Sequence, residues 1–191
     1  MKRILLSAAL SLFLASMSFA QEKTPEELKA EREVLKAERK SEAYQERQKK
    51  LAELKDPGST SVSSIDALAA NSTTALLETK KNNELLPELY KRTVGETVDG
   101  VTDVTVKKPT IEELLAVSES ILKTTKAVSA SSLEIARAQA DIKSAGMLKA
   151  VKATKSINYS KDVNSLLVAE LAYQSKLIAN LIATLKSSEN L

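Results

Sequence analysis

The sequence predicts an all-α protein, an elongated coiled-coil-like helical bundle with a long charged helix at its N-terminal end. Ala, Leu, Lys, Glu and Ser dominate the 191 residues, whereas glycine occurs only four times and aromatics make up 3%. This composition is typical of long helices. Thr24 and Thr110 are each followed three residues later by a glutamate, the capping box that begins helices. Leu114 starts a series of large apolar residues at steps of seven, as in supercoiled helices.

The first twenty residues have the pattern of a cleaved export signal. Lys2 and Arg3 form a basic head, residues 4–15 are apolar, and Ser18 and Ala20 are the small residues that signal peptidase accepts. The apolar run is shorter than the roughly 20 residues of a membrane-spanning helix, so a retained anchor is the less favoured alternative. We therefore expect Gln21 to be the mature N-terminus and the protein to be periplasmic or extracellular, in a bacterial envelope.

Charge and composition exclude several classes of function. Two of the 28 Lys and Arg residues leave with the signal, which leaves 26 basic against 25 acidic residues. A nearly neutral chain argues against nucleic-acid binding. The absence of Cys and His removes disulfides, most transition-metal sites and the commonest catalytic groups. The sequence therefore predicts neither enzyme activity nor a cofactor nor a metal.

One short motif has the spacing of a catalytic site. Ser120 and Lys123 match the S-x-x-K motif of serine acyl enzymes. That chemistry needs the serine at a helix N-terminus together with two partner motifs. Here the motif falls inside a predicted helix and both partners are missing, so we interpret it as a chance match.

Residues 21–56 are predicted to form a charged helical arm. Pro25 occupies the first helical position, and Asp56-Pro57-Gly58 ends the helix. Nine basic and eight acidic residues lie between Glu26 and Lys55. The apolar pairs Leu28/Leu35 and Tyr44/Leu51 keep seven-residue steps, but the stripe breaks between them. We expect a solvated arm, or half of a weak coiled coil, that leaves a thin seam for a partner.

A linker at 57–63 and a bundle domain at 64–191 should follow the arm. The first bundle helix spans about 64–92, and Pro87 is expected to kink or restart it. Asp99-Gly100 between Val and Thr residues predicts a hairpin within 93–106, with Val98 opposite Val101. Glu96 would then face Asp103, which is unfavourable, so a mobile loop stays open as the alternative.

Further helices are predicted at about 110–145, 147–157 and 162–188. Two of them carry a large apolar seam, made of Leu114, Ile121, Val128, Ile135 and Ile142 on one and Leu167, Leu171, Ile178, Leu181 and Leu185 on the other. Small residues accompany the first set and let a partner helix approach closely. We expect Ile121, Val128 and Ile135 to face Leu171, Ile178 and Leu181. An ordinary globular helix core remains the alternative.

A basic stretch between residues 137 and 161 is the candidate interaction face. It contains six basic residues and one acid, and Lys143, Lys149, Lys152 and Lys155 are its candidate contacts. Such a face binds anionic lipid or an acidic partner, although a merely solvated lysine face is the simpler interpretation.

The sequence resembles two known families, one in overall composition and one over a single segment. The exported, cysteine-free, charged helical chain resembles the Skp-like periplasmic chaperones in composition, but that family is strongly basic and places a strand before its helices. The segment SIDALAANSTTALLETKKNNELLPELYKR, residues 64–92, slightly resembles the helical minor pilins of conjugation machines. The sequence is assigned to neither family.

The sequence as a whole favours an exported, non-catalytic protein that binds protein partners or associates with itself. A membrane-surface or lipid-binding protein using residues 137–161 is one alternative. A minor-pilin-like component of a secretion or conjugation machine is the other.

Overall fold

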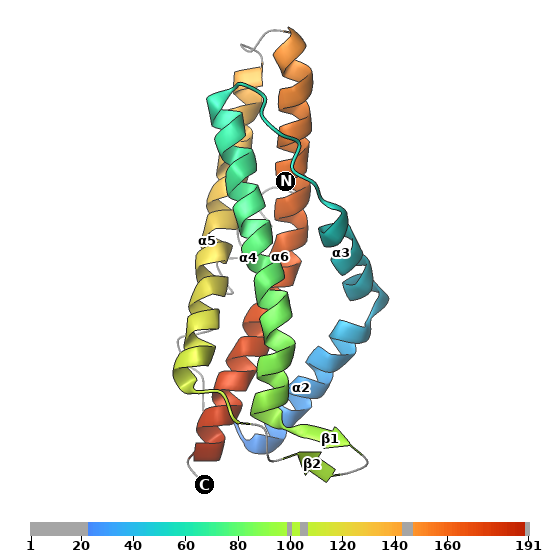
Figure 1. The fold of residues 1–191 in the computed structure, drawn as a ribbon, viewed down its shortest axis with the longest axis vertical. Coiled ribbons are helices and arrows are strands. Elements are labelled where there is room, and N and C mark those ends of the chain that lie inside the picture. Colours follow the sequence, from blue (N-terminus) through green and yellow to red (C-terminus); the bar gives the residue numbers. More distant parts are fainter. Residues whose placement is uncertain (1–22, 99–100, 104–106, 143–146, 190–191) are drawn as a thin grey trace.

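The computed structural model describes residues 23–98, 101–103, 107–142 and 147–189, and this part of the chain is all-α apart from one small hairpin (Figure 1). The elements are α2 (Pro25–Lys40), α3 (Glu42–Glu53), α4 (Ser63–Val94), β1 (Glu96–Val98), β2 (Val101–Asp103), α5 (Ile111–Asp141) and α6 (Met147–Glu189). The proposed signal, residues 1–20, lies outside the described residues.

Helices α4, α5 and α6 run side by side as an elongated bundle (Figure 1). Its main core includes Leu114, Ile121 and Val128 on α5, each at most 2% exposed, and Leu167, Leu171, Ile178, Leu181 and Leu185 on α6. Burying such side chains stabilises a fold by about 1.5–3 kcal/mol each. Both predicted capping boxes form, so that α2 begins after Thr24 and α5 after Thr110.

A second, smaller apolar cluster occupies the far end of the bundle. It consists of Ile65, Leu68, Ala138, Ala153 and Ile157, with the partly buried Val62, Ile135 and Ile142 packed against it. Along α5, the buried Ser131 lies between Val128 of the main core and Ala138 of this cluster. On α4 the two clusters adjoin at Leu68 and Ala69.

The packing partner expected for Ile135 is therefore wrong. Ile135 packs with Ala153 and Ile157 at the start of α6, instead of facing Leu171, Ile178 or Leu181. The chain reverses between α5 and α6, so residues late in α5 meet residues early in α6. A hydrogen bond of 3.1 Å from Asn164 to Ser131 fixes this register. Heptad spacing identified faces that pack together, but it carried no information about the register between them.

The arm departs most from the prediction. It is two helices, and Ser41 ends α2 and caps α3, since its hydroxyl accepts a hydrogen bond from the Tyr44 N–H at 3.2 Å. Leu28, Leu35, Tyr44 and Leu51 are at most 8% exposed, so the arm is not fully solvated. Its apolar pairs form a thin packed seam, as the second alternative expected, while most of its other residues are exposed. Tyr44 lies nine positions after Leu35, a step of about two and a half helical turns. In an unbroken helix the two side chains would therefore lie on opposite faces. The break at Ser41 brings both apolar pairs onto the bundle.

Helices α4 and α6 are longer and less interrupted than predicted, and the hairpin has the predicted register. Helix α4 continues through Pro87, and α6 continues through residues 158–161, where a break between two helices was expected. The hairpin forms with Val98 opposite Val101 and Glu96 opposite Asp103, which is the predicted register.

Candidate functional site

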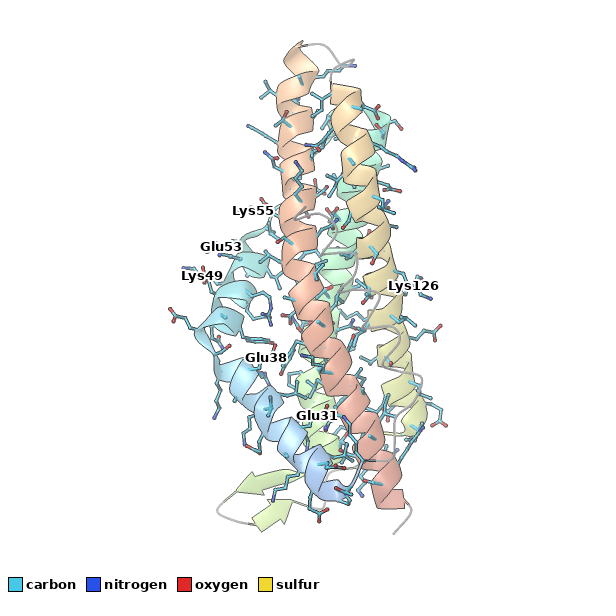
Figure 2. The ribbon with its side chains drawn as sticks, turned by 180° about the vertical axis from the view of Figure 1, so that it is seen from behind. Glu31, Glu38, Lys49, Glu53, Lys55 and Lys126 are labelled. Atoms are coloured by element: carbon cyan, nitrogen blue, oxygen red, sulfur yellow. The ribbon has the colours of Figure 1, made fainter. Side chains whose placement is uncertain are left out.

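The arm, helices α2 and α3, lies along one flank of α6, while α5 lies along the other (Figure 2). We call the surface that the arm covers the arm groove; it consists of Glu170, Tyr173, Gln174, Leu177 and Asn180 on α6 and Asn83 on α4. Glu170, Tyr173, Leu177 and Asn180 recur at steps of three and four, so they form one stripe of the helix. The hydrophobic pattern of the sequence does not reveal this stripe, because half of its residues are polar.

Two tyrosines mark the centre of the arm groove. The rings of Tyr44 on α3 and Tyr173 on α6 meet edge to face with their centroids 5.0 Å apart. The Arg47 guanidinium carbon lies 4.9 Å from the centroid of the Tyr44 ring, within the range of a cation–π interaction. Burial raises the pKa of Tyr173 to about 12. Burial, followed by the negative charge of Glu170, also raises the pKa of Tyr44.

An ion pair is buried beside these rings. Arg47 Nε donates to Glu170 Oε2 at 2.7 Å, and the Glu170 side chain is fully buried while that of Arg47 is 13% exposed. Removing charges from water costs several kcal/mol per ion, and a nearby opposite charge offsets this only when the remaining polar atoms are also bonded. The pair therefore specifies where α3 docks more than it adds stability.

A chain of amide hydrogen bonds joins α3, α4 and α6. Gln174 donates to the Thr79 carbonyl at 3.0 Å and to Asn83 Oδ1 at 2.7 Å. Asn83 in turn donates to Gln48 Oε1 at 3.1 Å. Because Gln48 belongs to the arm, the arm is tied to α4 as well as to α6.

The polar contacts of the arm groove are incomplete. Four buried atoms have no hydrogen-bond partner among the described residues: Arg47 Nη2, Gln48 Nε2, Glu170 Oε1 and Gln174 Oε1. Two are donors on the arm and two are acceptors on α6. An unsatisfied buried polar group costs about 1–3 kcal/mol, so the groove holds the arm less tightly than its apolar contacts alone would suggest.

A second set of polar contacts holds the first arm helix near the end of α6. Asn180 donates to the Leu28 carbonyl at 3.0 Å and to Glu31 at 2.8 Å. Arg32 Nη1 donates to Thr184 Oγ1 at 2.6 Å. Burial by itself raises the pKa of Glu31, but hydrogen bonds from Lys23 and Asn180 and nearby positive charges outweigh burial and lower it.

The segment between α3 and α4, predicted as a plain linker, has an ordered end. Asp66 accepts hydrogen bonds from the Thr60 hydroxyl at 2.6 Å, the Thr60 N–H at 2.7 Å and the Ser59 hydroxyl at 2.7 Å. These bonds, that from the Thr60 hydroxyl foremost, lower the pKa of Asp66. Thr60 is 2% exposed, whereas residues 55–59 are exposed. The segment is thus fixed at Thr60. Before it no side chain is buried, although Asp56 accepts a hydrogen bond from the Thr73 hydroxyl on α4 at 3.0 Å.

The candidate basic face is exposed where the structure describes it. Lys149, Lys152 and Lys155 on α6 and Arg137 on α5 are all exposed, and the salt bridges found among the described residues involve none of them. Lys143 lies outside the described residues. The face is therefore a solvated cationic surface near the end of the bundle.

The S-x-x-K motif lies in the middle of α5. The Ser120 hydroxyl is 3.4 Å from Asn82 Oδ1, to which it donates, and Lys123 is exposed. The Ser120 hydroxyl is therefore bonded to α4, whereas Lys123 lies at the surface.

Little in the described chain offers room or ligands for a small molecule. The crevice lined by Arg39, Tyr44, Asn83 and Tyr173, among others, has a volume of about 20 Å³, against roughly 300–1,000 Å³ for ligand pockets. Among the described residues, no group of three or more His, Cys, Asp or Glu is placed to hold a metal ion.

One stretch of α6, Lys149–Ser187, is long and apolar enough to cross a membrane by length and composition. Half of its most apolar window is buried inside the bundle, as in the core helix of a soluble protein. It is weak evidence for a membrane span.

Comparison with known proteins gives no further constraint. No protein-family profile matches the sequence, and searches of curated proteins and of solved structures find no match either.

Proposed function

We propose that this chain is an exported, non-catalytic helical protein that acts by binding or assembling with other proteins in the bacterial cell envelope. The observation that carries the proposal is the docked arm. A pair of charged helices is held side-on by a few apolar anchors, one buried ion pair and a mixture of polar contacts. This is the character of a non-obligate protein–protein interface, so the bundle presents a surface suited to binding a helix.

The composition favours binding over catalysis. The complete sequence contains no His and no Cys, which are the commonest general bases and strong nucleophiles. The crevice beside the two tyrosines has room for about one water molecule. A helical bundle with an exposed charged surface meets the needs of a binding protein without further groups.

Export is tested by the N-terminus of protein recovered from the producing cells. Intact-mass measurement should show a chain that begins at Gln21, in its free or cyclised form. A chain that retains Met1 would contradict export and the envelope location together.

Binding is tested by site-specific photo-cross-linking in the same cells. A photoreactive residue would replace Lys49 on the outer face of the arm, Lys126 on the outer face of α5, or Lys152 on the basic face. Lys49 and Lys126 lie on opposite sides of the molecule (Figure 2). The proposal predicts a discrete protein adduct from one of these faces and not from all three. The absence of an adduct at every position would contradict it.

A second candidate, binding to an anionic membrane surface, is favoured by the exposed lysines on α6. Each basic residue near an anionic surface contributes about 1 kcal/mol. Co-sedimentation with vesicles rich in phosphatidylglycerol would test it, with Lys149, Lys152 and Lys155 all changed to Gln. The matched control changes Lys36, Lys40 and Lys49 on the arm, which alters the net charge equally. Equal binding of the two variants would contradict a role for the basic face.

A further inference from the structure

The arm is held by side-chain contacts that a second copy of the chain reproduces. Its anchors are the Tyr44 ring against Tyr173 at 5.0 Å, the Arg47–Glu170 pair at 2.7 Å and the Leu28 carbonyl on Asn180 at 3.0 Å. Each of these contacts joins an arm residue to a residue of α6. An arm from another molecule therefore makes the same contacts, with the same geometry, in the same groove.

The arm is also the part of the described fold best suited to release. Arg47 Nη2 and Gln48 Nε2 on the arm, and Glu170 Oε1 on α6 beside Arg47, are buried and unpartnered among the described residues. Release of the arm lets such atoms regain water. Helix α3 has 12 residues and α2 has 16, close to the roughly 12–15 residues below which a helix without packing is marginal. Elements held in this way open more readily than the core of a domain.

The connection between arm and bundle has the features of a hinge. Residues 55–59 are exposed, Gly58 has φ of +77°, and a Cβ placed there would meet no atom within 4 Å. Pro57 favours an extended conformation for the residue before it. Ser61, which has φ of +61°, lies beyond Thr60, so its conformation belongs to the fixed end of the segment and not to the hinge. A short hinge connection is the kind of segment across which elements exchange.

We propose that the arm groove binds an arm in trans, and that the partner is a second copy of this chain, so that two copies associate by exchanging their arms. This inference rests on the proposed function, because it names the partner for the helix-binding surface. The exchange is symmetric, since each copy gives one arm and receives one. The contacts in the groove stay the same, and the conformation changes only between Leu54 and Thr60.

Concentration decides between the closed monomer and the exchanged dimer. A short flexible linker presents the chain's own arm at an effective concentration in the millimolar range. The closed form therefore dominates in dilute solution, and the exchanged fraction rises with protein concentration.

Cross-linking between differently marked copies tests the exchange directly. Arg32 on the arm and Thr184 on α6 are in contact, with 2.6 Å between Nη1 and Oγ1, and the chain has no cysteine of its own. One full-length copy would carry Arg32→Cys and the other Thr184→Cys. The two would be incubated together at high concentration, diluted, and treated at once with a short bismaleimide. A chain carrying both cysteines measures cross-linking within one molecule.

Exchange predicts a covalent product of one Arg32→Cys copy with one Thr184→Cys copy, and its yield rises with the concentration during incubation. The control pairs Arg32→Cys with Lys126→Cys, because Lys126 lies on the side of the molecule away from the arm (Figure 2). Its yield sets the background for random collision. If either cysteine variant does not melt cooperatively, Gln48→Cys and Asn83→Cys replace the pair, since these side chains meet at 3.1 Å.

The proposal is overturned if the doubly substituted chain cross-links within itself while the mixed copies stay at the background yield at every concentration. Such a result leaves the proposed function standing, because adducts to a different protein in cells do not require exchange. Conversely, exchange without any adduct in cells would support the arm groove as a self-association site and remove the case for a foreign partner.

Discussion

Replacing Arg47 by Met isolates the contribution of the buried ion pair to arm docking. The substitution keeps a long unbranched side chain and removes the guanidinium. Glu170 Oε2 then loses its 2.7 Å partner, and Oε1 has none to begin with in the part of the chain that the structure describes. A fully buried carboxylate is left uncompensated, unless the arm lifts and readmits water.

The expected loss of stability follows from the geometry of the pair. Breaking a buried ion pair by removing one partner costs about 3–5 kcal/mol. Because Arg47 is 13% exposed, we expect the lower end, about 3 kcal/mol, to which the lost cation–π contact with Tyr44 adds about 0.5–1 kcal/mol. The total is a large part of the 5–15 kcal/mol that stabilises a typical domain.

Urea denaturation of the Arg47→Met variant measures this loss. Far-UV circular dichroism follows all helices, while fluorescence, in a chain with no Trp, reports its four tyrosines, of which Tyr44 and Tyr173 pack against each other in the arm groove. If the arm undocks before the bundle unfolds, the fluorescence transition precedes that of the dichroism. Lys49→Ala, on the exposed face of the same helix, is the matched control and should change stability by less than about 0.5 kcal/mol.

A double variant separates the ion pair from arm packing as such. Arg47→Met combined with Glu170→Leu replaces both charges by apolar side chains, an exchange that is often neutral or stabilising for buried pairs. We expect it to recover most of the loss. If Arg47→Met alone cost less than about 1 kcal/mol and did not separate the two transitions, Glu170 would not be buried beneath a docked arm.

Three further predictions address the core, the tyrosine pair and the hinge. Val128→Asp places a charge at a site only 2% exposed and should abolish the cooperative thermal transition. A melting temperature equal to that of Lys49→Ala would show that Val128 is not a core residue. Burial raises the pKa of Tyr173 from its ordinary 10.0 to about 12. The contribution of the buried, neutral phenol to folding stability is therefore complete below pH 10 and is lost as pH rises toward 12. Denaturation at several alkaline pH values should show that the free energy of unfolding falls less steeply with pH for Tyr173→Phe than for the unsubstituted protein. Equal slopes for the two proteins would contradict the burial of the Tyr173 ring. Hydrogen bonds, chiefly from Thr60, lower the pKa of Asp66 below 3.8, so Asp66→Asn should reduce the melting temperature at neutral pH, with the difference shrinking as pH falls below 3.8; a constant difference would mean that the carboxylate charge contributes nothing.

Local signals in the sequence predicted local structure well. The capping boxes at Thr24 and Thr110 begin α2 and α5, and Asp99-Gly100 between Val and Thr residues predicted the register of the hairpin. These features depend on residues within a few positions of one another, so the sequence contains the whole cause. The all-α class follows in the same way from composition and heptad spacing.

Features that depend on distant residues were not predictable in this way. Helical periodicity assumes an unbroken helix, and the Ser41 break shifts the phase so that Leu35 and Tyr44 both reach the bundle. The register of α5 against α6, which places Ile135 beside Ala153 and Ile157, depends on where the chain reverses. The arm groove was missed because Glu170 and Asn180 count as surface residues in a hydrophobic pattern, although their burial depends on the arm that covers them.

Backbone amide hydrogen exchange of the full chain tests most directly whether the arm is a docked but releasable binding element. Exchange reports the free energy of local opening for each segment. Amides in α2 and α3 should be protected, yet should exchange clearly before those of α6 near Leu167 and Leu171, which open only with the whole bundle. Unprotected exchange throughout α2 and α3 would show that the arm does not dock, and exchange at the same rate as central α6 would show that it does not release.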